Sequence, residues 1–195
     1  MKSTRSFYNR ISILYPVIDF FLKRHRKRLI DAVNSEPPGN LLEVGVGSGS
    51  HLQLYKHHCI TGIDISESML HLAEQYKSPE NVLMLMDGEH MKFDDGSFDF
   101  VVMCHVLAVV GDPDQLLTEA HRVLRPGGML FILNHFTPAG FLSLVDRISE
   151  PVASLFHFRS RFYLSDLNAF QHFHLKHKIA LGIGSYFQIL IYTKP

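Results

Sequence analysis

Apolar residues recur with a helical period in the first part of the chain and gather in shorter, denser runs after it. Between residues 7 and 33 they return every three or four positions, which predicts an amphipathic helix. This stripe consists of Phe7, Ile11, Leu14, Ile18, Phe21, His25, Leu29 and Val33. Proline inside a helix removes a hydrogen bond and clashes with the preceding turn, so Pro16 predicts a break or kink near Tyr15.

From residue 41 onwards, apolar runs typical of buried strands alternate with segments typical of helices. Strands are predicted within 41–46, 60–65, 81–87, 95–110 and 127–136, and helices within 50–58, 66–77 and 112–124. This alternation predicts an α/β fold with parallel β-α units in a doubly wound sheet. The runs 172–181 and 185–194 flank a glycine-containing link, so we expect the sheet to finish with an antiparallel pair.

Length and charge limit the classes of protein to consider. We interpret the 195 residues as one domain, in which a helical cap (1–35) precedes a core (40–135) and a substrate-side segment with the hairpin (136–195). The 19 basic residues balance the 19 acidic ones, so no nucleic-acid partner is predicted. With no signal peptide, no spanning segment and no cysteine framework in the sequence, we expect a cytoplasmic protein.

The stretch EVGVGSG follows the first predicted strand, at the place where doubly wound sheets bind ligands. Gly45 and Gly47 permit positive φ and close approach of a ligand, and Gly49 permits tight packing of the next segment. A dinucleotide fingerprint would need a glycine at position 50, which is Ser50. Glu43 precedes the turn, where a carboxylate would repel a pyrophosphate and attract a cationic ligand.

Two further acids end the second and third predicted strands. Asp64 is placed to accept the hydroxyls of a ribose, and Asp87 to accept a hydrogen bond from an adenine amino group. Three acids at successive strand ends make a poor phosphate site but suit a cationic adenosine derivative. S-adenosylmethionine has both properties, so we predict it as the cofactor.

The ordered motifs EVGVGSG, GIDIS, MDGEHMKFDDGSFDFVVMCHVL and RVLRPGGMLFI resemble those of class I S-adenosylmethionine-dependent methyltransferases over residues 40–135. The resemblance implies a Rossmann-like, three-layer α-β-α fold with a seven-stranded sheet whose last strand is antiparallel. It also implies S-adenosyl-L-homocysteine as the product. By resemblance, the cofactor-binding residues are Glu43, Gly45, Val46, Gly47, Gly49, Asp64, Ile65, Met69, Asp87, Gly88, Glu89 and His105.

The flanks of this core bear on the methyl acceptor. The N-terminal helix, with its KRHRKR cluster, is either a cap on the core or a basic helix lying on an anionic membrane. LNHF places Asn134 and His135 near the reactive end of the cofactor, and His135 is either a general base or an ordinary packed imidazole. In FHFRSRFYLSD, the residues Arg159, Arg161 and Tyr163 either grip a phosphate or occupy an exposed segment.

The YNR and YPVID stretches, the basic helix, EVGVGSG and LNHF together resemble soluble bacterial phosphatidylethanolamine N-methyltransferases. This implies a monomer, peripherally associated with the inner face of the membrane, that methylates a phospholipid head group. Tyr8, Tyr15 and Phe136 are then expected to surround the methylated nitrogen, with Tyr15 also closing over the cofactor. The alternatives are a quinone or other small-molecule methyltransferase and a non-catalytic cofactor- or membrane-binding module. His172 and His174 lack a third ligand at a zinc-like spacing, so no metal is predicted.

Overall fold

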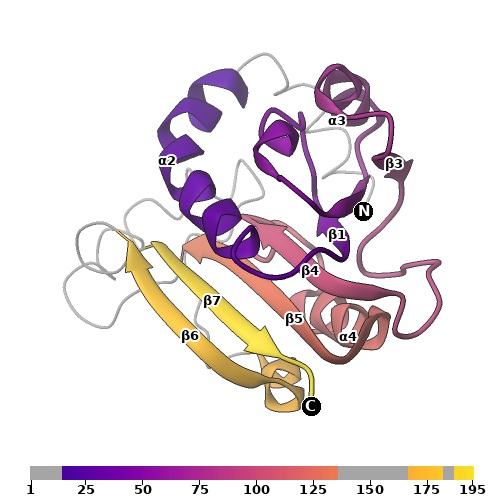
Figure 1. Cartoon of the computed structure of the whole chain (residues 1–195), viewed down its shortest axis with the longest axis vertical. Coiled ribbons are helices and arrows are strands. Elements are labelled where there is room, and N and C mark those ends of the chain that lie inside the picture. Colours follow the sequence, from indigo (N-terminus) through magenta and orange to yellow (C-terminus); the bar gives the residue numbers. More distant parts are fainter. Residues whose placement is uncertain (1–14, 136–166, 182–186) are drawn as a thin grey trace.

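The computed structural model describes residues 15–135, 167–181 and 187–195, with the backbone alone for residues 15–22. The elements in chain order are α2 (Tyr15–Val33), β1 (Asn40–Val44), η1 (Leu52–Leu54), β2 (Cys59–Asp64), α3 (Glu67–Ala73), η2 (Glu74–Tyr76), β3 (Val82–Leu85), β4 (Phe98–Cys104), α4 (Pro113–Val123), β5 (Leu124–His135), η4 (Asn168–His172), β6 (His174–Leu181) and β7 (Phe187–Thr193). The strands form one sheet, and the helices lie against it (Figure 1).

The seven strands follow the order β3-β2-β1-β4-β5-β7-β6 (Figure 1). Strands β1 to β5 run parallel, whereas β7 pairs antiparallel with β5 on one side and with β6 on the other. The predicted doubly wound sheet and its antiparallel last strand are therefore confirmed. Because the chain builds the sheet outward in both directions from β1 and β4, the carboxyl ends of these two neighbours form the crevice in which such sheets bind ligands.

Different helices cover the two faces of the sheet, as a three-layer fold requires. On one face, Leu29 and Val33 of α2 share an apolar cluster with Phe131 of β5. On the other face, Leu116 of α4 shares a cluster with Leu130 of β5. Neighbouring residues of β5 thus serve opposite faces, because side chains alternate along a strand. The helical stripe predicted from the sequence is confirmed where its residues are described.

The helix α2 begins at Tyr15, with Pro16 in its first turn, where the missing N–H leaves no helical hydrogen bond unmade. Residues 1–14 lie outside the described part of the chain, so the predicted break near Tyr15 stays a prediction. The basic cluster divides between two environments. Arg26 is buried, with 5% of its surface exposed, whereas its basic neighbours Lys23, Arg24, Lys27 and Arg28 are exposed.

The α-helix predicted at 50–58 is wrong, because this segment contains only the single 3-10 turn η1. Its backbone groups bond to a residue far away in the sequence. The Asn34 amide donates to the carbonyl of Leu54 at 2.9 Å, and the Asn34 side-chain oxygen accepts from the backbone N–H of Lys56 at 3.1 Å. A longer helix would need these same groups, so tertiary contacts override the local helical pattern.

Candidate active site

The glycine turn after β1 has the conformation that its sequence predicts. Gly45, Gly47 and Gly49 have φ values of 70°, 57° and 66°, a region that only glycine adopts readily. A Cβ atom on Gly45 would lie 2.6 Å from a methyl group of Val106, and one on Gly49 would lie 2.7 Å from the Cβ of Ala73. The turn therefore packs directly against the end of β4 and against α3. Its backbone edges the crevice between β1 and β4.

Asp64, at the end of β2, joins this turn to the start of α3. Its Oδ2 accepts the N–H of Gly47 and its Oδ1 accepts the N–H of Ser66, both at 2.9 Å. Burial raises the pKa of the Asp64 carboxyl, and the backbone hydrogen bonds oppose that rise. Two oxygens held by fixed backbone donors keep free lone pairs, so the carboxylate stays able to accept the predicted ribose hydroxyls. Of its predicted neighbours, Ile65 is half-buried and Met69 is 1% exposed.

The loop after β3 holds Asp87, Gly88 and Glu89 in three different ways. Asp87 Oδ1 accepts the backbone N–H of Glu89 at 2.9 Å. A Cβ atom on Gly88 would lie 2.8 Å from a methyl group of Val44 and 2.9 Å from one of Leu116, so a larger residue would force these side chains to shift. The Glu89 carboxylate accepts the N–H of Gly111 at 2.7 Å and so points to the connection before α4. Within this segment, the Glu89 side chain is therefore turned to another loop, and the predicted contact of Asp87 with an adenine stays a prediction.

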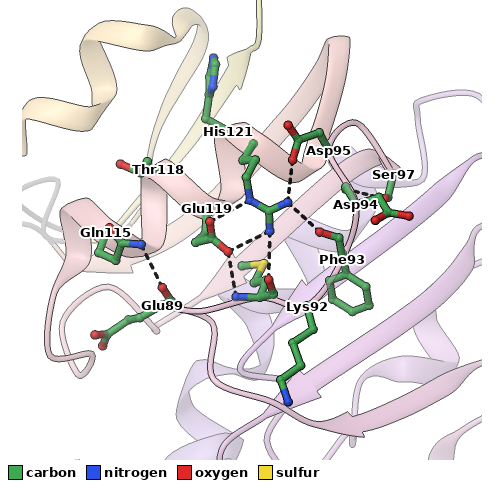
Figure 2. A network of polar contacts seen from close by, with 12 residues as sticks. Glu89, Lys92, Phe93, Asp94, Asp95, Ser97, Gln115, Thr118, Glu119 and His121 are labelled. Atoms are coloured by element: carbon green, nitrogen blue, oxygen red, sulfur yellow. Dashed lines mark hydrogen bonds and ion pairs between the residues drawn. The ribbon is translucent and has the colours of Figure 1, made fainter.

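A network around Arg122 of α4 fixes the rest of that loop (Figure 2). The guanidinium donates to the carbonyl of Phe93 at 2.7 Å and to the carbonyl of Met91 at 3.0 Å. It also pairs with Asp95 at 2.8 Å and with both carboxylate oxygens of Glu119. Glu119 Oε2 in turn accepts the N–H of Met91 at 2.8 Å. We call these five residues the Arg122 network, which the sequence analysis did not predict.

The Glu43 carboxylate points toward the face covered by α2. Its side chain is 1% exposed and its Oε1 is hydrogen-bonded to Nε2 of His51, which follows the glycine turn. Tyr55 lies beside this pair, and its burial, reinforced by the Glu43 charge, raises the pKa of the Tyr55 hydroxyl well above its usual value. A buried carboxylate paired in this way is held in place by the protein, and its predicted role toward the cofactor stays a prediction.

His105 and His135 lie at the carboxyl ends of β4 and β5 on the same face. The N–H of His105 donates to the carbonyl of Leu133 at 2.7 Å, and His135 pairs in register with Phe187 of β7. The His105 ring meets the Phe187 ring edge-on at 5.7 Å, and His25 of α2 lies 5.0 Å from the same ring. The α2-side cluster, as we name it, consists of His25, Arg26, Glu43, His51, Tyr55, His105 and His135.

Asn134 does not belong with His135. Strand alternation places Asn134 with Leu130 and Ile132, toward the face covered by α4, and His135 toward α2. Asn134 is fully buried, and its side-chain amide donates to the carbonyl of His135 at 2.9 Å. The backbone therefore brings the two residues together, while their side chains serve opposite faces.

Other predicted residues lie beyond the described ranges. Tyr8, Phe136, Arg159, Arg161 and Tyr163 fall outside them, and of Tyr15 only the backbone is described, so these assignments stay predictions. Within residues 15–135, 167–181 and 187–195, no group of three or more His, Cys, Asp or Glu side chains is placed to hold a metal ion. None of the helices in the same ranges combines the length and the apolar character needed to span a bilayer.

Residues 42–132 match the family model of a methyltransferase domain. The chain belongs to the S-adenosylmethionine-dependent methyltransferases, and S-adenosylmethionine is its cofactor. It is similar to a phosphatidylethanolamine N-methyltransferase of Cereibacter sphaeroides, with 32% identity over 176 residues that cover 87% of this chain and 86% of that protein.

Two further comparisons bear on the acceptor and on the fold. A demethylmenaquinone methyltransferase of Tropheryma whipplei strain Twist is 30% identical over 147 residues, which cover 71% of this chain and 62% of that protein. A solved structure of a methyltransferase from Thermotoga maritima, described as a possible histamine N-methyltransferase, has a TM-score of 0.72. It covers 98% of this chain and 100% of that chain at 23% identity, which shows a shared fold.

The residues at the crevice fit this cofactor. The glycine turn leaves backbone, without side chains, facing the ligand at positions 45, 47 and 49. The segments 43–49, 64–69 and 87–89 contain acids and no lysine or arginine, so their charge favours a sulfonium and an ammonium group. The prediction of this cofactor from the acids and glycines is confirmed, while the role of each single residue remains a prediction.

Proposed function

We propose that this methyltransferase methylates the ethanolamine head group of phosphatidylethanolamine at an anionic membrane surface. The observation that carries the proposal is the length of the match to the Cereibacter sphaeroides protein. That match spans 87% of the chain, whereas the general methyltransferase domain begins at residue 42 and ends at residue 132. The similarity therefore includes flanking residues, and the flanks of such a fold bear the specificity for the acceptor.

The exposed face of α2 supports contact with an anionic membrane. Leu29, Ile30 and Val33 are buried against the sheet, so between residues 23 and 33, where the side chains are described, no large apolar side chain of this helix is left for a bilayer. Its outer face instead carries the exposed basic residues Lys23, Arg24, Lys27 and Arg28. Each basic residue near an anionic surface contributes on the order of 1 kcal/mol, so these four supply a substantial electrostatic attraction.

The reaction requires that the acceptor nitrogen be aligned with the methyl group and that the acceptor lose one proton. When bound, S-adenosylmethionine supplies an electrophilic methyl group on its sulfonium. A nitrogen–carbon bond forms as the carbon–sulfur bond breaks, and the ammonium group of the acceptor must first lose a proton to leave a nucleophilic lone pair. The residues of the chain hold nucleophile and methyl group in line, which can supply much of the rate.

His135 is our candidate for the base that takes this proton. It ends β5 beside the crevice, it is 2% exposed, and it faces the α2 side where His105 also lies. His105 itself is poorly suited, because burial together with Arg26, His135 and His25 lowers its pKa to about 3. Such a weak base has little driving force to take a proton from an ammonium group near neutral pH.

The acceptor is tested by incubating the protein with labelled S-adenosylmethionine and phosphatidylethanolamine vesicles, with and without an anionic lipid. Labelled mono-, di- or trimethylated lipid, formed faster when anionic lipid is present, is the expected result. Labelled quinone in place of labelled lipid would overturn the proposal in favour of the alternative raised by the demethylmenaquinone methyltransferase match. No labelled lipid from a protein that binds the cofactor in calorimetry would also overturn it.

Two variants separate the roles of His135 and of the basic face. His135→Ala should lower kcat by roughly 10² to 10⁴, the usual contribution of a positioned base, with little change in cofactor affinity. His71→Ala, on the exposed surface of α3, is its matched control. Replacing Lys23, Arg24, Lys27 and Arg28 by Gln together should weaken vesicle binding and leave cofactor binding intact; unaltered vesicle binding would remove α2 from the membrane contact.

A further inference from the structure

The α2-side cluster adjoins the cofactor crevice at the ends of the next strands along the sheet. Register places Phe187, the first residue of β7, opposite His135, the last residue of β5. His25 and His105 contact the Phe187 ring from α2 and from the end of β4. Side chains from two elements far apart in the sequence thus meet at the Phe187 ring, beside the carboxyl end of β5.

The groups that meet there are cationic or become so on protonation. The pKa of His105 is lowered first by burial and then by the charges of Arg26, His135 and His25, which lie close enough to act on its ring. Burial and two arginines of α2, Arg28 and Arg24, also lower the pKa of His25. The other titratable groups of the same region are Glu43 of β1, His51 and Tyr55 after the glycine turn, and Cys104 of β4.

Two imidazole nitrogens in this cluster are buried with no hydrogen-bond partner among the described residues, namely Nδ1 of His25 and Nε2 of His105. A buried polar atom without a partner costs about 1–3 kcal/mol, and a structure that keeps two of them usually does so for a reason. His105 is also the one described non-glycine residue with a positive φ, at 60°. Such a conformation costs energy in a non-glycine residue and is typical of functional sites.

We propose that Arg26, His25 and His105 form a binding site for a phosphate oxyanion of the methyl acceptor. An oxyanion would accept hydrogen bonds from the two imidazoles and from a guanidinium, whose planar fork matches phosphate geometry. Its negative charge would also favour the protonated form of both rings. The acceptor named here rests on the proposed function, in which the phosphodiester of the lipid lies two carbons from the amine that is methylated.

Histidine ring resonances in NMR test the site directly, without any turnover. Glycerophosphoethanolamine and inorganic phosphate should shift the C2–H signals of His25 and His105 and raise the pKa of each ring, whereas ethanolamine alone should not. Arg26→Gln should weaken the binding of glycerophosphoethanolamine at least tenfold. Arg125→Gln, which removes the same charge from an exposed arginine at the start of β5, should leave it unchanged.

His105→Asn provides a second variant if Arg26→Gln does not fold, since Asn accepts a positive φ and keeps a smaller polar side chain. It should weaken the binding of both inorganic phosphate and glycerophosphoethanolamine. Unshifted histidine signals with both phosphate probes would overturn the site. Signals that shift only with S-adenosylhomocysteine would also overturn it, because the oxyanion bound there would then be the carboxylate of the cofactor. Phosphate binding by a protein that methylates no phospholipid would support the site and refute the proposed function, and lipid methylation without phosphate binding would do the reverse.

Discussion

The Arg122 network and the α2-side cluster lie on opposite faces of one sheet and differ in the burial and in the hydrogen bonding of their polar groups. In the network, Arg122 bonds to two backbone carbonyls and two carboxylates, and its side chain is 30% exposed. In the cluster, Glu43 and Arg26 are almost completely buried, and ring nitrogens of His25 and His105 lack partners among the described residues. Each nitrogen of the Arg122 guanidinium donates to acceptors within the protein, which suits a role in holding a loop. The cluster leaves two buried ring nitrogens without a partner among the described residues, which suits a role in binding a ligand.

The largest expected effect comes from Glu43. Replacing it with Ala removes one partner of a buried pair and leaves His51 in a site that excludes water. Breaking such a pair costs roughly 3–5 kcal/mol of unfolding free energy. Chemical denaturation of the variant and of wild type, in urea at pH 7.5, measures this loss.

Glu43→Gln is the control for this loss, because the amide keeps the shape and one hydrogen bond to His51. It should lose clearly less stability than Glu43→Ala. Equal losses would mean that packing, and not the pairing with His51, makes this position important.

Arg122→Ala should have the next largest effect, about 2–3 kcal/mol, because it leaves two loop carbonyls and Glu119 without their charged donor. It should also weaken cofactor binding, since the same loop carries Asp87. Calorimetry with S-adenosylhomocysteine measures the second effect. Arg122→Lys keeps the charge without the fork, so it should restore only part of both properties. Loss of stability with unchanged cofactor affinity would separate the network from the site.

The two regions also differ in how far the sequence could predict them. The glycine turn and the acids at the strand ends are local features, and a residue that must adopt positive φ or follow a strand is readable from its neighbours. Arg122 bonds to atoms 27 to 31 positions away, so no spacing rule reveals it. The same reason explains the failure at 50–58, where Asn34 captures backbone groups from 20 and 22 positions away.

Arg26 illustrates an intermediate case. The sequence placed it within a basic cluster, and the helical period placed His25 on the apolar stripe. A charged residue next to that stripe is the signal that was available, because only one side of an amphipathic helix reaches solvent. The pattern alone does not say whether such a residue turns inward, since that depends on Tyr55 and His105, which lie near it from two other segments.

The two regions should affect the pH dependence of stability over different ranges of pH. A histidine whose pKa falls to about 3 on folding stays neutral while the unfolded chain binds a proton, so stability declines as pH falls from about 6.5 toward 3. His105 contributes up to about 1.4 kcal/mol per pH unit in that window. The pKa of Glu119 is lowered by its hydrogen bonds to Arg122. Its contribution to the unfolding free energy is therefore lost only as the pH falls below the ordinary pKa of a glutamate.

Urea unfolding at pH 7.5, 6.0 and 5.0 for wild type and His105→Asn measures the difference. The variant should lose stability less steeply between pH 6.5 and 5, whereas Arg122→Ala should keep the wild-type slope there. Identical slopes for wild type and His105→Asn would show that His105 takes up its proton in the folded protein without cost.

The smallest expected effect is that of Asp95→Ala. Asp95 pairs with Arg122 at 2.8 Å, yet its side chain is 81% exposed, and a pair that water reaches contributes at most a few tenths of a kcal/mol. Arg122 retains Glu119 and both carbonyls in this variant, so the loop should stay in place and the unfolding free energy should change by less than about 0.5 kcal/mol. A loss above about 1.5 kcal/mol would mean that the network acts as one cooperative unit that includes its exposed member. The network and the α2-side cluster would then differ only in how deeply their polar groups are buried, because the stability of each region would depend on all of its polar contacts.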